Sequence, residues 1–190
     1  MNCRLVLASQ SPRRREILTS AGLDFEIRAG EVSEIRHPHE PVADYVRRLA
    51  RAKAEAVPRG AGEVVLGADT VVVIGDDVLG KPRDAEDAAR MLALLSGREH
   101  IVVTGISLVH SGGVECDAAE TRVRFAELST REIAEYVASG EPADKAGGYA
   151  IQGLASKFVE RVEGCYFNVV GLPVTLVYRL LKSLSCDSAK

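Results

Sequence analysis

Short apolar runs and amphipathic stretches alternate along the chain, and each change of period predicts a new element. The pattern predicts strands at 3–8, 63–74, 78–81, 100–110, 114–127, near 157–162 and at 165–170. It predicts helices at 12–21, 41–57, 84–96, 130–139 and from 173 to about 184. Strand–helix units mixed with hairpins predict an α/β fold with a mixed, twisted sheet flanked by helices. Since no repeat or linker divides the 190 residues, we expect a single domain over 1–190.

Capping residues support two of the helices. Asp84 suits the N-cap of the helix at 84–96, and Gly97 follows its end. Ser129 and Glu132 have the spacing of a capping box at the start of the helix at 130–139. These polar residues therefore fix the expected starts of both helices.

Three consecutive arginines stand where the helix at 12–21 begins. Ser11 suits its N-cap and Pro12 its first position. A cation in the first turn costs from a few tenths to about 1 kcal/mol, because the helix N-terminus is already positive. Arg13 and Arg14 lie in that turn, and their guanidinium groups, with free backbone N–H groups, suit phosphate oxygens. The pattern indicates a phosphate site; the alternative is a solvated basic cluster.

Two charges interrupt apolar patterns. Lys53 falls on the apolar stripe of the helix at 41–57, where it must either extend its ammonium to solvent or meet a partner. Asp69 interrupts the apolar strand at 63–74, so it should be paired, hydrogen-bonded or metal-bound, or have a raised pKa. Gly67 and Ala68 leave room beside it. We expect a catalytic or metal-binding carboxylate; the alternative is a residue that caps a turn or fixes a bulge.

Hairpin counting places a third candidate cation. With a turn of two or three residues after the strand at 63–74, Lys81 lies opposite Thr70 or Val71. Lys81 would then share one end of the hairpin with Asp69. This favours a cation at the site, and the alternative is a simple salt bridge between Lys81 and Asp69.

A glycine-rich loop at 141–153 follows the capping-box helix. Its glycines allow a ligand to approach the backbone closely. Gln152 offers both a donor and an acceptor, as recognition of a base edge requires. The alternative is an ordinary connecting loop.

Charge and composition exclude some classes of function. A net charge of −3 gives no general basic field for a nucleic-acid duplex, so any anion site must be local. Aromatic residues make up 5% and Trp is absent, which argues against a stacking platform for single strands. We therefore expect no nucleic-acid partner.

The remaining sequence features indicate the compartment. The four cysteines, Cys3, Cys116, Cys165 and Cys186, lack metal-ligand spacing, which favours free thiols in a reducing cytosol. The longest apolar runs are too short for a membrane span, and the arginines come too early for a signal peptide. These features predict a cytoplasmic protein. His100 and His110, at the ends of one strand, are expected at the surface.

Taken together, several segments resemble the Maf family of nucleoside triphosphate pyrophosphatases, from about Leu5 to Leu180. The matching motifs are Leu7-Ala8-Ser9-Gln10-Ser11-Pro12-Arg13-Arg14, Gly67-Ala68-Asp69-Thr70-Val71-Val72, Leu79-Gly80-Lys81-Pro82, Leu95-Ser96-Gly97-Arg98, Asp144-Lys145-Ala146-Gly147-Gly148-Tyr149-Ala150-Ile151-Gln152-Gly153 and Tyr166-Phe167-Asn168-Val169-Val170-Gly171-Leu172-Pro173. In this order and spacing the set is highly specific.

The resemblance implies hydrolysis of a nucleoside triphosphate to the monophosphate and pyrophosphate, with a divalent cation (Mg or Mn). It also implies a cytoplasmic setting, often a homodimer, and an elongated α/β fold with a central cleft, similar to inosine triphosphate pyrophosphatases. Gln152 resembles the branch that prefers dTTP and UTP, and Arg13 and Thr70 stand at the other positions that the family links to nucleotide choice. House-cleaning of modified pyrimidine nucleotides is the expected setting.

The resemblance and the residue types together assign roles. Ser9, Arg13 and Arg14 would hold phosphate oxygens, with Lys53 and Lys81 neutralising the triphosphate and the leaving pyrophosphate. Asp69 would be the general base and also a metal ligand. Gln152 and Thr70 would read the base.

Two departures from the family pattern accompany these roles. Ala150 replaces a common Gly, and the segment 31–36 is less acidic than many counterparts, which weakens the case for Glu31 or Glu34 as a metal ligand. The alternatives are a pyrophosphatase for 7-methyl-GTP or damaged purine triphosphates, and a non-enzymatic nucleotide- or nucleic-acid-binding regulator of septation.

Overall fold

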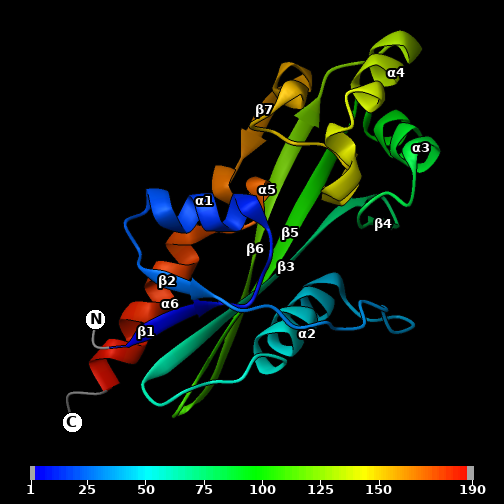
Figure 1. Ribbon diagram of the computed structural model, residues 1–190. Helices are drawn as coiled ribbons and strands as arrows, with labels where there is room; N and C mark the ends of the chain where they lie inside the picture. Colours follow the sequence, from blue (N-terminus) through cyan, green and yellow to red (C-terminus); the bar gives the residue numbers. More distant parts are fainter. Residues whose placement is uncertain (1–2, 188–190) are drawn as a thin grey trace. The chain divides into compact units, whose positions relative to one another are not determined.

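The computed structural model describes residues 3–187 and contains the predicted mixture of strands and helices (Figure 1). The elements are β1 (Arg4–Leu7), α1 (Pro12–Ser20), β2 (Phe25–Ile27), α2 (Val42–Glu55), β3 (Glu63–Ile74), β4 (Asp77–Leu79), α3 (Ala85–Leu95), β5 (Glu99–His110), β6 (Gly113–Phe125), α4 (Thr130–Ala138), the 3-10 turns η1 (Glu141–Asp144), η2 (Ala146–Gly148) and η3 (Leu154–Phe158), β7 (Val159–Glu163), α5 (Tyr166–Val170) and α6 (Val174–Asp187).

The described strands form one mixed sheet of seven strands, which confirms the α/β class. Its order is β2-β1-β3-β5-β6-β7, and β4 pairs with β3 outside this path. β1 runs parallel to β2 and β3, whereas the β3–β4 and β6–β7 pairs are antiparallel. Parallel pairs need crossover helices and antiparallel pairs need only turns, which accounts for the change from helical connections to hairpins along the chain.

The predicted caps are confirmed with one difference. The Asp84 carboxylate accepts from Asp87 N, and Ser129 and Glu132 form the complete capping box. Ser11 does occupy the N-cap of α1, but its hydroxyl makes no capping hydrogen bond. Its backbone N–H instead donates to Ser9 Oγ over 3.3 Å, so the loop before α1 is organised around Ser9.

Two element predictions were wrong. The segment expected as a strand at 165–170 is the helix α5, because a short apolar run is compatible with either structure. The fully buried Asn168 decides the packing there, donating to Val102 O and Thr121 Oγ1, both over 3.0 Å. β2 was missed, since three residues are too few to show a period.

Contacts within the chain group it into two compact units. Unit 1 comprises Met1–Asp69, Thr104–Ala119 and Gly171–Lys190, and unit 2 comprises Thr70–Val103 and Glu120–Val170. β3, β5 and β6 each contribute residues to both units. The expectation of a single domain over 1–190 stays a prediction.

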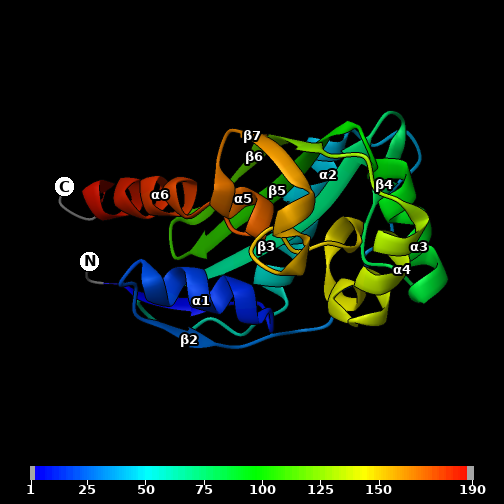
Figure 2. The same cartoon turned by 90° about the horizontal axis from the view of Figure 1, so that it is seen from above.

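Unit 2 has a core rich in aromatic rings. α3 and α4 lie side by side in both ribbon views and contact each other (Figures 1 and 2). Beneath them Phe125 packs edge-on to Tyr149, with ring centroids 4.8 Å apart, and Phe158 packs edge-on to Tyr136 at 5.5 Å. His100 also lies in this core at 2% exposure, so its predicted surface position was wrong. His100 lies on the inward face of β5, and its ring packs edge-on against the rings of Phe125 and Tyr149.

Unit 1 is held together by close contact between α2 and the sheet. Val6 and Val65 from the strands pack with Ala54 of the helix and with Val57, which follows it. Gly67 in β3 allows the closest approach, because a Cβ there would lie 2.0 Å from Ala50 O. At Gly105 in β5 a Cβ would similarly lie 2.3 Å from the Val46 backbone. The missing side chains of these glycines therefore set the position of α2 above β3.

Replacing Gly67 by alanine is expected to lower the free energy of unfolding by about 3 kcal/mol, the upper end for overpacking a core. The added methyl group cannot fit without moving α2, because its nearest neighbours are backbone atoms of Ala50 and Ala54. Urea unfolding of the variant measures this loss. Gly80→Ala is the matched control, since a Cβ at Gly80 meets no atom within 4 Å; equal stability of the two variants would contradict the packing argument.

The remaining sequence expectations concern thiols and membranes. Cys3, Cys116 and Cys165 are free thiols, whereas the side chain of Cys186 lies outside the described residues. None of the helices in residues 3–187 combines the length and hydropathy that crossing a membrane requires.

Candidate active site

The loop between β1 and α1 carries the first part of the candidate site. Ala8 N donates to Leu66 O over 2.8 Å, which fastens the loop to β3. The Arg14 guanidinium then joins three segments of unit 1, donating to Ser9 Oγ (3.1 Å), Ala68 O (2.8 Å) and Gly171 O (2.9 Å). The structure therefore brings Ser9 and Arg14 together beside the strand that carries Asp69.

The second part of the site centres on one ammonium group. Lys53 Nζ lies 2.5 Å from Asp69 Oδ1 and 2.6 Å from Glu34 Oε1. The exposed fraction is 17% for the Lys53 side chain and 9% for that of Asp69, against 51% for Glu34. Lys53 thus meets partners instead of reaching open solvent, and Asp69 lies within a continuous strand and not at a turn.

The electrostatics of this cluster favour a reactive carboxylate. Burial raises the pKa of Asp69, and the nearby charge of Glu34 adds to that effect. The positive charges of Lys53 and Arg14 oppose it, but the direction that remains is upward. Burial also lowers the pKa of Arg14, although a guanidinium stays protonated at any working pH. Asp69 is therefore a stronger base than an exposed aspartate.

Glu34 and Tyr45 are further neighbours in the site: sequence analysis weakened the case for Glu34 as a metal ligand and did not name Tyr45. The Tyr45 hydroxyl donates to Glu34 O over 2.7 Å, and Arg48 donates to both carboxylate oxygens of Glu40 over 2.7 and 2.8 Å. These bonds hold the segment around Glu34 against α2. Burial raises the pKa of Tyr45, so its hydroxyl remains a donor at neutral pH. No local pattern in the segment indicates this position, because the contacts depend on α2.

Arg13 is half-buried on α1, next to Arg14 in the first turn. Its charge lies close enough to lower the pKa of Arg14 further. Two guanidinium groups in one turn repel each other, which is the arrangement expected where an anion belongs. The structure leaves the phosphate role of Arg13 a prediction.

Unit 2 carries the remaining predicted residues, at the end of the β3–β4 hairpin. The register pairs Val72 with Leu79, and continuing it by two residues would set Lys81 opposite Thr70. The pairing of Lys81 itself stays a prediction. β4 itself ends at Leu79, and Lys81 is exposed. Within the described residues, Asp69 forms a salt bridge with Lys53. The role of Lys81 and the alternative Lys81–Asp69 pair both stay predictions.

The glycine-rich loop meets this hairpin in unit 2. Gly147 N donates to Gly80 O over 2.9 Å, which brings the loop beside the residue preceding Lys81. Gly147 and Gly148 have φ values of 69° and 71°, a backbone conformation that suits only glycine well. Gln152 is exposed farther along this loop, and Thr70 is half-buried.

A divalent metal fits the carboxylates of the cluster in unit 1. Among residues 3–187 no group of three or more His, Cys, Asp or Glu side chains is arranged to hold a metal ion. Asp69 and Glu34, however, both meet the same ammonium group, so two oxygen ligands converge there. Mg²⁺ is commonly held by one or two carboxylates together with substrate phosphates. The donor set therefore fits such an ion only when a phosphate completes it.

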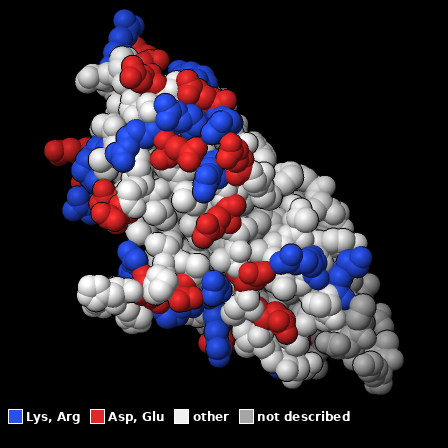
Figure 3. Space-filling view, turned by 180° about the vertical axis from the view of Figure 1, so that it is seen from behind, with Lys and Arg blue, Asp and Glu red and all other residues white. Residues whose placement is uncertain are grey.

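Acidic and basic side chains are interspersed on the molecular surface in the view of Figure 3, without a broad field of either sign. This agrees with the small net charge of −3. Attraction of an anion therefore depends on local groups such as Arg14 and Lys53. The field of such charges is screened beyond about 10 Å in ordinary salt.

Comparisons with known proteins identify the family. Sequences named dTTP/UTP pyrophosphatase are 54% identical in Hahella chejuensis, covering 94% of this chain and 91% of the relative, and 56% identical in Anaeromyxobacter dehalogenans, covering 94% and 93%. A solved Ham1 protein from Staphylococcus aureus matches over 65% of this chain and 72% of its own length, at 15% identity and with a TM-score of 0.45. The sequence model described as Maf-like protein matches residues 4–184. The chain therefore belongs to the Maf-like family.

Proposed function

We propose that this chain is a nucleoside triphosphate pyrophosphatase that converts dTTP and UTP to the monophosphate and pyrophosphate. The proposal rests on a buried Asp69 whose raised pKa and contact with Lys53 suit a general base, beside the guanidinium of Arg14. The names of the similar proteins from Hahella and Anaeromyxobacter supply the substrate class. No observation favours the non-enzymatic regulator over this reaction.

The phosphates bind to the loop between β1 and α1. Arg14 is already oriented by Ser9 and by backbone carbonyls, so little side-chain entropy is lost when it contacts an anion. Arg13 and the backbone N–H groups at the start of α1 supply further donors. Lys81 neutralises charge on the triphosphate, as the family resemblance implies.

Asp69 accepts a proton from the attacking water. The water oxygen forms a bond to the α-phosphorus, the bond between that phosphorus and the α–β bridging oxygen breaks, and pyrophosphate leaves with the bridging oxygen. Lys53 holds Asp69 Oδ1 at 2.5 Å, which orients the carboxylate and favours its ionised form. Positive groups around the phosphates stabilise the charge that develops on the leaving group.

The reaction uses a divalent cation, Mg²⁺ or Mn²⁺, as the family resemblance implies. Asp69 and Glu34 would hold it, with substrate phosphate oxygens completing its ligands. When bound, such an ion lowers the pKa of the attacking water and neutralises phosphate charge. Lys53, which contacts both carboxylates, would add its positive charge beside the phosphates.

Base selection is assigned to Gln152, with Thr70 and Arg13 contributing. The exposed Gln152 amide can donate and accept at once, which matches the edge of uracil or thymine. A site that hydrogen-bonds one base edge rejects another strongly, because its polar groups are then left unpaired. A homodimer, a cytoplasmic location and the house-cleaning of modified pyrimidine nucleotides stay predictions of the resemblance.

Pyrophosphate release from a panel of triphosphates tests the activity. With Mg²⁺ or Mn²⁺, dTTP and UTP are expected to be cleaved much faster than GTP, ITP or 7-methyl-GTP, and chelation of the metal should remove the signal. Preference for 7-methyl-GTP or ITP selects the purine alternative instead. Tight nucleotide binding without any release would support the regulator and overturn the proposed reaction.

A further inference from the structure

The turn that carries Gln152 is bound on both sides by two side chains outside it. Gly153 N donates to Ala150 O over 3.0 Å, so Gln152 is a central residue of a tight turn. Ala150 N, before the turn, donates to the Tyr136 hydroxyl over 3.1 Å. Leu154 N, after it, donates to Glu141 Oε1 over 3.1 Å.

The two side chains are also bound to each other. The Tyr136 hydroxyl donates to Glu141 Oε2 over 2.7 Å, so one oxygen of the carboxylate faces Tyr136 and the other faces Leu154. Gly153 packs directly on this carboxylate, since a Cβ there would lie 2.2 Å from Glu141 Oε1. We call Tyr136 and Glu141, with these bonds, the bracket.

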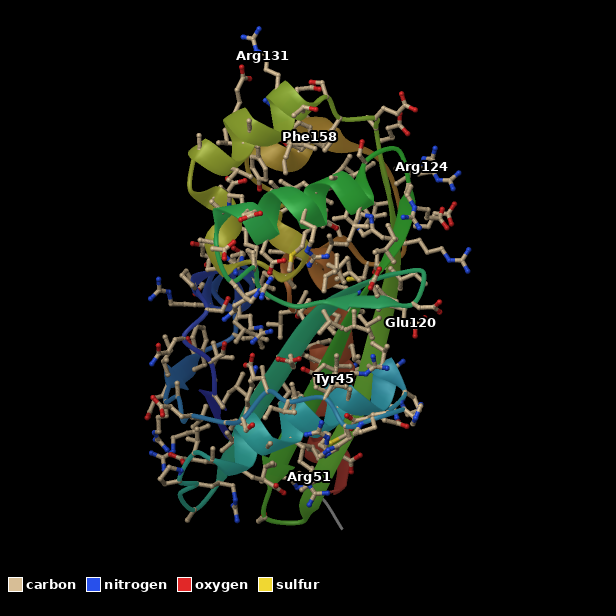
Figure 4. All side chains as sticks on the ribbon, turned by 90° about the vertical axis from the view of Figure 1, so that its right-hand side faces the viewer. Tyr45, Arg51, Glu120, Arg124, Arg131 and Phe158 are labelled. Carbon is tan, nitrogen blue, oxygen red and sulfur yellow. The ribbon has the colours of Figure 1, made fainter. Side chains whose placement is uncertain are left out.

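The bracket rests on a rigid base within unit 2. Tyr136 is 3% exposed and packs edge-on against Phe158, which lies beside α4 in Figure 4. Lys145 Nζ donates to the backbone oxygen of Glu141 over 2.6 Å, which fixes the carboxylate-bearing residue. Burial and the Glu141 bond raise the pKa of Tyr136, so its hydroxyl keeps its proton across the working range.

We propose that Tyr136 and Glu141 are positioning residues that determine nucleotide choice by fixing the turn of Gln152. The inference rests on the proposed role of Gln152 in reading the base. A glutamine amide on a loose turn could rotate to suit several bases, whereas a fixed turn presents its donor and acceptor in one direction. Neither bracket residue needs to touch the nucleotide.

Two variants weaken the bracket in different ways. Tyr136→Phe removes the hydroxyl and with it the bonds to Ala150 N and Glu141 Oε2. Glu141→Gln keeps the shape but leaves one acceptor oxygen where two are used. In each variant we expect the ratio of kcat/KM for UTP to that for GTP to fall about fivefold, the effect of one ordinary hydrogen bond. The change should appear mainly in KM for UTP.

A second readout does not depend on catalysis. Amide hydrogen exchange at Ala150 should become faster in Tyr136→Phe, because its N–H loses its acceptor. Exchange at Leu154 should become faster in Glu141→Gln, because Leu154 N and the Tyr136 hydroxyl then compete for one oxygen. If Tyr136→Phe fails to fold, both the kcat/KM ratio and the amide exchange can still be measured in Glu141→Gln, because Glu141 is only half-buried.

Two controls separate positioning from general loss of stability. Glu135→Gln removes a carboxylate from the same helix, where Glu135 pairs with Arg131, a side chain that extends away from α4 in Figure 4. Ile133→Val loosens the packing of α4 without touching the bracket. Both controls should keep the ratio of UTP to GTP of the unaltered enzyme.

The outcomes distinguish the two proposals. If Gln152→Ala changes the ranking but both bracket variants keep it, the bracket inference is overturned and the role of Gln152 stands. If Ile133→Val shifts the ratio as much as the bracket variants do, stability explains the effect and the inference is again overturned. An unchanged ranking in Gln152→Ala overturns both the reader role and the bracket.

Discussion

Asp69→Asn is expected to reduce kcat for dTTP and UTP by about 10²- to 10⁴-fold, the ordinary contribution of a general base. The amide keeps the size of the carboxylate and an oxygen for Lys53, so the contact at 2.5 Å can persist in part. It cannot accept a proton from water, so kcat should fall by this factor while nucleotide affinity changes little. Steady-state pyrophosphate release and nucleotide binding by calorimetry measure the two quantities.

The control for this variant is Asp76→Asn, which changes the same residue type in the exposed turn between β3 and β4. It should leave kcat unaltered. The pH dependence gives a second check, because burial raises the pKa of Asp69. The base is active only when ionised, so the acid limb of kcat should lie above the pKa of an exposed aspartate. Retained turnover in Asp69→Asn would remove the base assignment.

Lys53→Met is expected to cost about 3 kcal/mol of unfolding free energy, the lower end for removing one partner of a buried ion pair. Methionine fills the space of the aliphatic stem but leaves Asp69 and Glu34 without their shared cation. Urea unfolding measures the loss. The loss should exceed that of Arg51→Met, because Arg51 on the same helix pairs with Glu55 at the surface (Figure 4), where solvent screens the pair and its contribution is small.

The deficit of Lys53→Met should depend on pH with a definite sign. Lys53 lowers the pKa of Asp69, so removing it raises that pKa further above the ordinary value of 3.8. The folded variant then binds a proton more tightly than the unfolded chain, and its stability falls as pH rises through this interval. The deficit is therefore larger at pH 8 than at pH 4. The acid limb in the pH profile of kcat should also shift to higher pH. If it does not shift, the contact with Lys53 does not determine the ionisation of Asp69.

Local chemistry was sufficient to predict most elements. The caps at Asp84 and Ser129 and the long strand through Asp69 follow from interactions within a few residues of each other. The strand predicted at 165–170 was wrong because its apolar residues fit the period of a strand or of a helix. The hydrogen bonds of Asn168 to β5 and β6 favour the helix. The surface position predicted for His100 was wrong for a related reason. A polar ring at a strand end can be buried when a partner such as Tyr149 supplies a hydrogen bond, here of 2.8 Å.

The sequence by itself determined which residues need an explanation. Lys53 and Asp69 interrupt apolar patterns, and an interrupted pattern implies a partner whatever the fold. Only the tertiary structure decided which residue each of them contacts. Lys53 and Asp69 are 16 residues apart, and they meet because Gly67 lets α2 lie directly on β3.

The same division holds for Glu34 and for the bracket. Glu34 joins the cluster through Tyr45 of α2, and Glu141 reaches Leu154 across 13 residues of loop. Such contacts depend on how separate elements pack, and packing is fixed by long-range burial and not by local periodicity. Residue types and spacing therefore indicate which residues are candidates for chemistry, whereas the packing of the elements determines which of these residues meet.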